Sequence, residues 1–296
     1  MLKSKKKILI TGGAGFVGTN LINFFLKKTK FNIISLDNYS SGSKKNHIKN
    51  NRVKYINGHT KNIMDLIKDP KNIYTIFHFG EFARIYQSFL KMNECIDSNF
   101  TGSHAVFNFC LRNNIKLVYS ATSASLGNKG KDKNLSPYAF TKAQNLEMLE
   151  NFKKYSKFKY EVIYFYNVYG PCQISKGAMA TVIGIFEDHY LRKKPLPVVR
   201  PGTQTRRFTH IEDTINIVYQ AWKKKLNRHY IIANTKSYSI LEVAKMFKTK
   251  IKYLPPREGE RYTSALVKKN LSNKIYKHYG KISLKSYIIE FLKKNS

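Results

Sequence analysis

Short runs of β-branched and aromatic residues alternate with longer amphipathic stretches through the first half of the chain. Their length and composition predict buried strands at residues 8–10, 32–36, 53–56, 74–79, 116–119 and 161–166. Helical spacing of apolar positions predicts helices at residues 17–28, 90–112 and 139–155. Strand–helix alternation of this kind predicts an α/β fold, with a parallel sheet covered by helices on both faces.

This rhythm changes after Pro171. Shorter elements follow, separated by Pro195, Pro197, Pro201, Pro255 and Pro256. We therefore expect a large first domain over residues 1–170 and a smaller C-terminal lobe over residues 171–296, with parts of residues 203–235 packing back on the first domain. The last predicted element is an amphipathic helix over residues 282–296.

Positive charge dominates the composition. The chain carries 53 Lys and Arg residues against 18 Asp and Glu, a formal net charge of +35. Such a surplus suggests a nucleic-acid partner. The lysines are nevertheless dispersed in short runs, such as residues 5–7 and 223–225, and no aromatic RNA-binding signature accompanies them. We therefore expect a solvated basic surface that attracts anionic substrates, and no main role in nucleic-acid binding.

Other compositional features narrow the class of protein. Cys95, Cys110 and Cys172 are an odd and scattered set, which predicts a reducing compartment, the cytoplasm, without a disulfide framework. The eight histidines show no grouping with cysteine or carboxylate, so no metal site is predicted. No segment approaches about 18 uninterrupted apolar residues, so no membrane span is expected.

A glycine-rich turn follows the first predicted strand and opens the first predicted helix. Its glycines fit G-x-G-x-x-G (Gly13, Gly15, Gly18) or G-x-x-G-x-x-G (Gly12, Gly15, Gly18). Glycines permit a tight turn and bring backbone N–H groups close to a pyrophosphate at the helix N-terminus. The next strand ends in Asp37, 19 residues after Gly18 (37 − 18), where a carboxylate can accept both adenosine ribose hydroxyls. The sequence therefore predicts a Rossmann-type dinucleotide site that prefers NAD to NADP, because Asp37 would repel a 2′-phosphate.

Candidate chemistry lies at Tyr138 and Lys142, which are four residues apart and share one helical face. An ammonium near a phenol would lower the phenol's pKa from about 10 toward working pH and make Tyr138 a general acid/base. This spacing also arises by chance in lysine-rich helices. Its position after a strand that leads into Thr122 supports function, because ligands in open α/β sheets bind at the carboxyl ends of strands. We assign Thr122 as the third member, hydrogen-bonded to the reacting oxygen.

Together these motifs resemble the extended short-chain dehydrogenase/reductases, specifically the NAD-dependent nucleotide-sugar epimerase/dehydratase group, over nearly the whole chain. Further matching segments are residues 36–42, 77–80, 99–102, 120–127, 166–171 and 202–213. The resemblance implies that NAD contacts the turn glycines and a further set of residues: Phe16, Val17, Asp37, Asn38, His59, Phe79, Gly80, Asn99, Tyr138, Lys142 and Tyr166. It also implies a homodimer through the helices at residues 90–112 and 139–155.

The residues after Thr122 distinguish reactions within this group. Its 4,6-dehydratases carry an Asp-Glu pair where this chain has Ser123 and Ala124, and its decarboxylases carry Glu at the second position. Ala124 supplies no ionisable group for additional proton transfers. The expected activity is therefore NAD-dependent C4 epimerisation of a UDP-hexose or UDP-N-acetylhexosamine. The alternatives are a 4-ketosugar reductase of the same fold and a non-catalytic basic nucleic-acid-binding protein.

For the UDP-sugar, the resemblance points to Asn167, Arg206 and Arg257, and a guanidinium suits a diphosphate. Seven residues after Arg257 the group has a residue that sets pocket size. The small Ser264 at that place implies room for an N-acetyl group.

One departure from the group pattern adds two charges near the site. Gly80 and Glu81 stand where two alanines are usual, and Arg84 follows. Two interpretations are open: Glu81 and Arg84 form a local ion pair, or they touch substrate. We expect the ion pair.

Overall fold

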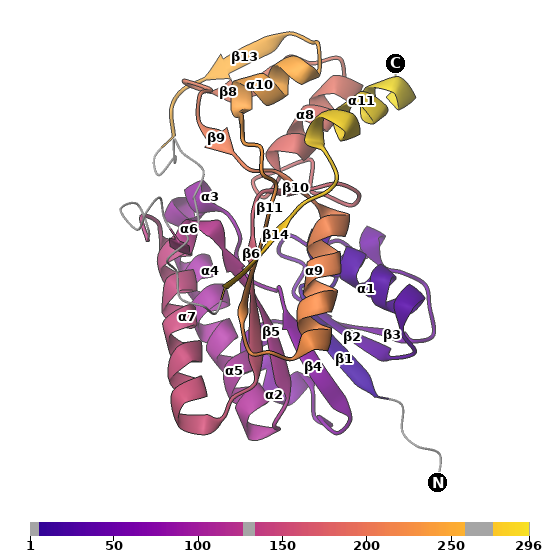
Figure 1. The fold of residues 1–296 in the computed structure, drawn as a ribbon, viewed down its shortest axis with the longest axis vertical. Helices are drawn as coiled ribbons and strands as arrows, with labels where there is room; N and C mark the ends of the chain where they lie inside the picture. Colours follow the sequence, from indigo (N-terminus) through magenta and orange to yellow (C-terminus); the bar gives the residue numbers. More distant parts are fainter. Residues whose placement is uncertain (1–5, 127–133, 258–274, 296) are drawn as a thin grey trace.

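An eight-stranded parallel sheet forms the centre of the protein, whose computed structural model describes residues 6–126, 134–257 and 275–295 (Figure 1). Its strands are β1 (Lys7–Thr11), β2 (Asn32–Asp37), β3 (Val53–Asn57), β4 (Ile73–His78), β5 (Lys116–Thr122), β6 (Tyr160–Phe165), β11 (His229–Ala233) and β14 (Ile275–Tyr279). They lie in the order β14-β11-β6-β5-β4-β1-β2-β3, and neighbours pair in parallel. The predicted Rossmann-type α/β fold is confirmed.

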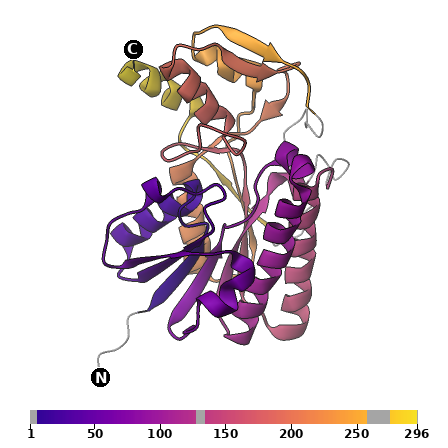
Figure 2. The same cartoon turned by 180° about the vertical axis from the view of Figure 1, so that it is seen from behind.

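Alternation along each strand sends side chains into two separate cores. In β1, Ile8 and Ile10 join one cluster with α1 (Phe16–Lys28) and α9 (Ile211–Lys224), while Leu9 joins another with α5 (Ser103–Arg112) and α7 (Pro137–Ser156). Figures 1 and 2 show these two helical layers on opposite faces of the sheet. The helices packed on the sheet or following its strands are α1 (Phe16–Lys28), α2 (Ile63–Leu66), α3 (Ile85–Leu90), α4 (Met92–Ile96), α5 (Ser103–Arg112), α6 (Ser123–Leu126), α7 (Pro137–Ser156) and α9 (Ile211–Lys224).

The helix predicted at residues 90–112 is subdivided in the structure. Lys91 separates α3 from α4, and a π-helical segment, η3 (Asp97–Gly102), joins α4 to α5. Two short 3₁₀ turns, η1 (Lys44–Asn46) and η2 (Thr60–Asn62), complete this part of the fold.

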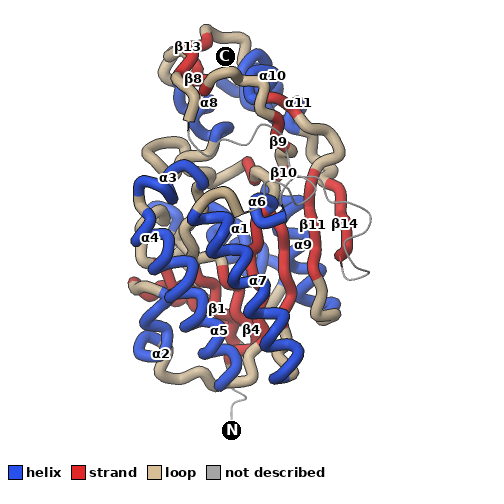
Figure 3. The backbone as a smooth tube through the Cα atoms, turned by 90° about the vertical axis from the view of Figure 1, so that its left-hand side faces the viewer, coloured by secondary structure: helices blue, strands red, loops and turns tan. Residues whose placement is uncertain are grey.

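A smaller lobe lies beyond the carboxyl ends of the sheet strands (Figures 1 and 3). Its core is a separate apolar cluster that includes Phe186, Val198 and Phe247. The remaining elements are β7 (Val168–Tyr169), α8 (Val182–Leu191), β8 (Leu196–Val199), β9 (Thr205–Arg206), β10 (Thr209–His210), β12 (Tyr238–Ser239), α10 (Ile240–Met246), β13 (Ile251–Leu254) and α11 (Leu284–Asn295). The last of these corresponds to the predicted closing helix.

The chain passes between sheet and lobe more than once. After residue 170 it forms α8 and β8 in the lobe, then returns to the sheet as α9 and β11, and β14 later adds an edge strand. Division into domains at residue 170 therefore stays a prediction. Among the described helices, none is long and apolar enough to cross a membrane.

Candidate active site

A cavity of about 550 Å³ lies where the carboxyl ends of the strands face the lobe. Its walls come from the turns that follow β1, β2, β4, β5 and β6, and from α7, α8 and β9. Strand order therefore brings residues far apart in sequence to one crevice, as expected for a parallel sheet.

The glycine-rich turn forms one end of the cavity. Gly12 has a positive φ of 69°, and a Cβ there would lie 2.8 Å from the backbone nitrogen of Gly80. Only glycine permits this conformation and this close approach between the two turns. Helix α1 begins at Phe16, and its N-cap, Gly15, makes no side-chain hydrogen bond to the first turn. The first N–H groups of α1 are therefore available to bind an anionic group such as a pyrophosphate.

Asp37 lies at the end of β2, next to this turn, and only 7% of its surface is exposed. Its Oδ2 accepts a hydrogen bond from the Ala14 backbone (2.9 Å) and its Oδ1 accepts one from the Tyr39 backbone (2.8 Å). Burial raises the pKa of Asp37, and these backbone bonds oppose the rise. Each oxygen retains a lone pair for another donor, so the carboxylate fits a pair of vicinal ribose hydroxyls.

Other residues predicted to contact NAD also line the cavity. These are Gly18, Phe16, Val17, Asn38, His59, Phe79 and Gly80. His59 is fixed in place because its Nδ1 accepts a hydrogen bond from the Lys61 backbone (3.1 Å), and its Nε2 lies 3.5 Å from Asp97 Oδ2. Burial lowers the pKa of His59.

Asn99 and Tyr166 are not brought to the cavity wall. The Asn99 amide is fully buried, accepting a hydrogen bond from the Phe82 backbone nitrogen (2.6 Å) and donating one to the Phe82 carbonyl oxygen (3.0 Å). It therefore holds the loop after β4. Tyr166 is 1% exposed and lies in the apolar core between the sheet and α7. The family resemblance implied that both residues contact NAD, but in the structure neither residue lines the cavity.

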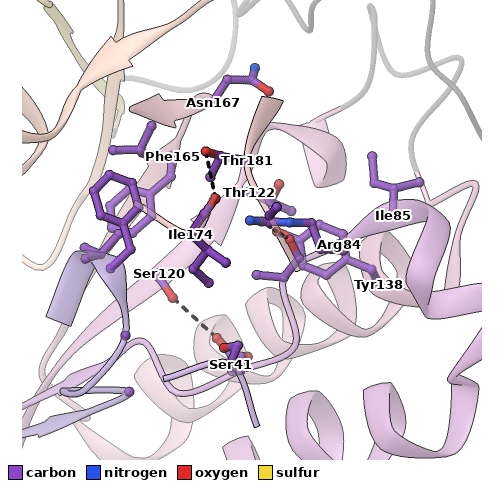
Figure 4. Close-up of a pocket in the computed structure, with 18 of the residues that line it drawn as sticks. Ser41, Arg84, Ile85, Ser120, Thr122, Tyr138, Phe165, Asn167, Ile174 and Thr181 are labelled. Carbon is purple, nitrogen blue, oxygen red and sulfur yellow. Dashed lines mark hydrogen bonds between the residues drawn. The ribbon is translucent and has the colours of Figure 1, made fainter. Parts of the chain in front are cut away.

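Thr122, Tyr138 and Lys142 come together as predicted from their order along the chain. Thr122 ends β5, and Tyr138 lies in the first turn of α7, where Ser136 caps the helix by accepting a hydrogen bond from Ala139 N (3.1 Å). The Thr122 and Tyr138 side chains are hydrogen-bonded to each other. Figure 4 shows both beside Arg84 in the cavity. This pair can hold one oxygen atom of a substrate between two hydroxyl groups.

Lys142 forms an ion pair that the sequence did not predict. Its ammonium donates to the carboxylate of Glu81 and to the carbonyl oxygen of Ser120, and both charged side chains are almost completely buried. The expected ion pair between Glu81 and Arg84 is therefore wrong. In a helix, side chains three residues apart lie close together. Glu81 and Arg84 precede α3, and the Arg84 backbone is extended (φ −138°, ψ 129°), so this proximity is lost.

The acidity of Tyr138 also differs from the prediction. Burial raises the pKa of Tyr138 to about 12, and the charge of Glu81 adds to the rise, while the Thr122 hydrogen bond and the Arg84 guanidinium oppose it. Lys142 was expected to lower this pKa, but its ammonium faces Glu81. Burial lowers the pKa of Lys142 itself, and Glu81 opposes that change.

Arg84 lines the cavity, whereas the sequence favoured a local ion pair with Glu81 over contact with substrate. Its guanidinium donates to the carbonyl oxygens of Ala83 (2.8 Å) and Met179, and its buried Nε has no hydrogen-bond partner among the described residues. The available signal was the departure at Gly80 and Glu81, which marked this loop as unusual.

The residues predicted to bind the nucleotide line the lobe side of the cavity. Asn167 donates a hydrogen bond to the Arg207 carbonyl (3.3 Å), Arg206 donates to the Thr205 carbonyl (2.9 Å), and the Arg257 guanidinium lies 5.4 Å from the centre of the Tyr86 ring. The remaining substrate residue, Ser264, lies outside the described residues.

Among the described residues, few ionisable groups other than Tyr138 and Lys142 line the part of the cavity near Tyr138. Ser123 and Ala124 are on the wall, and the described wall residues include two carboxylates, Asp37 at the glycine-turn end and Glu81 in its ion pair. Among the described residues, no three His, Cys, Asp or Glu side chains gather in a group that could hold a metal ion.

Comparison with known proteins adds a family context. Residues 8–233 match the NAD dependent epimerase/dehydratase family. A protein of Methanocaldococcus jannaschii, provisionally named UDP-glucose 4-epimerase, is 27% identical over 86% of this chain and 88% of its own length. The UDP-N-acetyl-alpha-D-glucosaminuronate decarboxylase of Bacillus cytotoxicus is 28% identical over 81% of this chain and 78% of its own. The crystal structure of the Thermotoga maritima UDP-glucose 4-epimerase with UDP-glucose superposes with a TM-score of 0.84 at 23% identity, covering 97% of this chain and 99% of that one.

Proposed function

Because the chain belongs to the NAD dependent epimerase/dehydratase family, we propose that it inverts C4 of a UDP-hexose or UDP-N-acetylhexosamine through a transient 4-keto sugar. NAD is its cofactor, and the turn at Gly12, the uncapped start of α1 and the free lone pairs of Asp37 fit that molecule. The proposed substrate follows the UDP-sugars named for the similar proteins.

One observation supports the choice of epimerisation: among the described wall residues beside Tyr138, only the Tyr138 phenol is suited to moving protons. Ala124 has no ionisable side chain, and Glu81 is committed to Lys142. Removing water from C5 and C6 of a sugar requires additional acid/base groups. Oxidising a secondary hydroxyl and reducing the same carbon requires only one proton acceptor, which then returns the proton.

In this mechanism, Thr122 and Tyr138 hold the C4 oxygen between their hydroxyl groups. Tyr138 accepts the hydroxyl proton as the C4–H bond breaks, and it gives the proton back to the same oxygen when that bond is remade. When bound beside the glycine-rich turn and Asp37, NAD would supply a reversible hydride acceptor for C4, so the cofactor would not be consumed. The ketone must rotate within the cavity before the hydride returns, and the site must keep water away from it.

Arg206 and Arg257 are proposed to bind the diphosphate, because a guanidinium can donate two parallel hydrogen bonds to phosphate oxygens. Both line the lobe side of the cavity, whereas Thr122, Tyr138 and Lys142 line its sheet side. Acceptance of an N-acetyl group rests on the small side chain of Ser264 in the sequence.

Assembly and location complete the proposal. Exposed apolar side chains on neighbouring α4, η3 and α7, among them Met92, Phe100 and Phe140, support a homodimer formed through this face. The three cysteines are free, which supports a cytoplasmic location.

A UDP-sugar panel tests the proposal. The purified protein is denatured to identify any released nucleotide, and the native protein is then incubated with UDP-glucose and with UDP-N-acetylglucosamine while products are separated by chromatography. We expect the C4 epimer to accumulate without net NADH formation or loss. Stoichiometric NADH consumption would instead identify a ketosugar reductase.

The matched variants are Tyr138→Phe and Tyr155→Phe, both on α7. Tyr155 is 75% exposed, so its variant controls for loss of a phenol from the same helix. Tyr138→Phe is expected to abolish turnover, and Tyr155→Phe to leave it unchanged. A normal rate in Tyr138→Phe would refute the mechanism.

A further inference from the structure

The ammonium of Lys142 is fully engaged by the protein. It donates to Glu81 Oε2, to the Ser120 carbonyl and, at 3.4 Å, to the Ser120 hydroxyl. An ammonium has three N–H donors, and these three acceptors use all of them. Lys142 therefore has no donor left for the phenol of Tyr138 while this arrangement persists.

Glu81 is built into the protein as the partner of that ammonium. Besides Lys142, its carboxylate accepts hydrogen bonds from Ser103 Oγ (2.8 Å), Tyr119 Oη (3.0 Å) and, more weakly, Asn145 Nδ2 (3.4 Å). Two further buried hydrogen bonds support Ser103 from behind, through His78 and Thr11. These donors converge on one carboxylate and fix its position.

Arg84 has a different electrostatic environment. The acceptors of its guanidinium are two neutral carbonyl oxygens, and among the described residues no carboxylate forms an ion pair with it. Carbonyl groups satisfy hydrogen-bond donors but do not cancel a net charge. A guanidinium also stays protonated when buried, since its ordinary pKa exceeds 12. Arg84 thus places an uncompensated positive charge beside Tyr138 (Figure 4).

We propose that Glu81 and Arg84 together set the acidity of Tyr138: Glu81 neutralises Lys142, and Arg84 supplies the positive charge that stabilises the phenolate. Both act through Tyr138 and are positioning residues for the reaction. This inference rests on the proposed function, in which Tyr138 accepts a proton. Among the described residues, the ionisable groups that interact electrostatically with Tyr138 include Glu81 and Arg84 from the loop before α3, Cys95 from α4 and Tyr119 from β5, while Lys142 lies one turn along α7.

The charges act on Tyr138 in the directions that this arrangement requires. Glu81 raises the pKa of Tyr138 and Arg84 lowers it. At a pH below that pKa, the phenolate fraction, and hence the rate of proton acceptance, changes about tenfold when the pKa moves by one pH unit. Removing either charge should therefore shift the plot of kcat against pH along the pH axis.

The test compares Arg84→Met, Arg84→Lys, Glu81→Gln and the control Glu94→Gln in the NAD-loaded protein. Glu94 pairs with Lys91 on the exposed surface of α4 and loses the same charge away from the cavity. Arg84→Met should move the rising limb of kcat to higher pH by about one pH unit, a roughly tenfold loss at pH 7, with KM changed less than about threefold. Arg84→Lys should restore most of this loss. Glu81→Gln should move the limb to lower pH, and Glu94→Gln should leave it unchanged.

A second measurement does not depend on turnover. For each variant, the near-ultraviolet absorbance of tyrosinate is measured as the pH is raised. The same titration is done after adding Tyr138→Phe to that variant, and the difference between the two curves gives the titration of Tyr138. At a fixed alkaline pH below unfolding, we expect more Tyr138 phenolate in Glu81→Gln than in the wild type, and less in Arg84→Met.

The outcomes separate this inference from the proposed function. If the titrations shift as expected while no UDP-sugar is epimerised, the inference holds and the proposed function fails. If epimerisation occurs but both charge variants leave the limb and the titration in place, the inference is overturned. It is also overturned if Arg84→Met raises KM alone, because Arg84 would then bind substrate instead of acting on Tyr138.

Discussion

Replacing Asp37 with asparagine tests how the chain selects its cofactor. Two of the lone-pair directions of Asp37 already accept backbone hydrogen bonds, from Ala14 and Tyr39, which leaves one free direction on each oxygen. A hydrogen bond to a charged group contributes about 1.5–3 kcal/mol, and the neutral amide of an asparagine at this position would keep one bond of about 1 kcal/mol. Loss of about 3 kcal/mol corresponds to a roughly 100-fold higher Kd for NAD.

The assay is calorimetric titration of the NAD-free protein with NAD and with NADP. In the wild type, NAD should bind more tightly than NADP, because Asp37 repels the 2′-phosphate. In Asp37→Asn this preference should shrink as NAD affinity falls. NAD affinity of the wild type should also weaken as pH falls through the raised pKa of Asp37, where the carboxylate becomes protonated.

The matched control is Asp69→Asn, which makes the same charge change at a side chain that is 64% exposed and paired with Lys7 at 3.6 Å. It should leave both affinities unchanged. A Kd for NAD in Asp37→Asn within about threefold of the wild type, with a folded protein shown by an unchanged circular dichroism spectrum, would refute the assignment of Asp37 to the ribose hydroxyls.

Two further predictions concern the scaffold and the assembly. Lys116→Met leaves the fully buried Glu161 without its 2.7 Å ion-pair partner, so denaturant unfolding should show a loss of about 3–5 kcal/mol; a loss below about 1 kcal/mol would contradict this account. Phe100→Glu and Phe140→Glu place charges on exposed apolar positions of η3 and α7 and should shift a dimer to monomers in sedimentation velocity; an unchanged mass would exclude this face as the interface.

Features set by backbone geometry could be predicted from the sequence. The alternation of strands and helices along the chain predicted a sheet covered on both faces, and Ile8, Leu9 and Ile10 of β1 do point alternately into two cores. Gly12 and Asp37 line one crevice in the structure, as the sequence predicted, because consecutive parallel strands present their carboxyl ends at the same edge.

Features set by side-chain packing could not be predicted in this way. Asn99 matches a family position, but its amide turns into the protein to bind the Phe82 backbone. Glu81 and Lys142 are 61 residues apart, and nothing in either local pattern favours their pairing over the nearer Arg84. Glu81 pairs with Lys142 and not with Arg84 because the backbone at Arg84 is extended. A helix would have brought the side chains of Glu81 and Arg84 together.

Charge composition explains why this choice affects the chemistry. With 53 basic and 18 acidic residues, carboxylates are the scarce partners, and many cations must remain without one. Most such cations face water, where screening makes an unpaired charge inexpensive. In the cavity, two cations, Lys142 and Arg84, lie near Tyr138, but among the described residues only one carboxylate is close to them. That carboxylate, Glu81, pairs with Lys142. The unpaired positive charge is therefore that of Arg84. Which cation stabilises the Tyr138 phenolate thus depends on which cation pairs with Glu81, and not on the spacing of Tyr138 and Lys142 along α7.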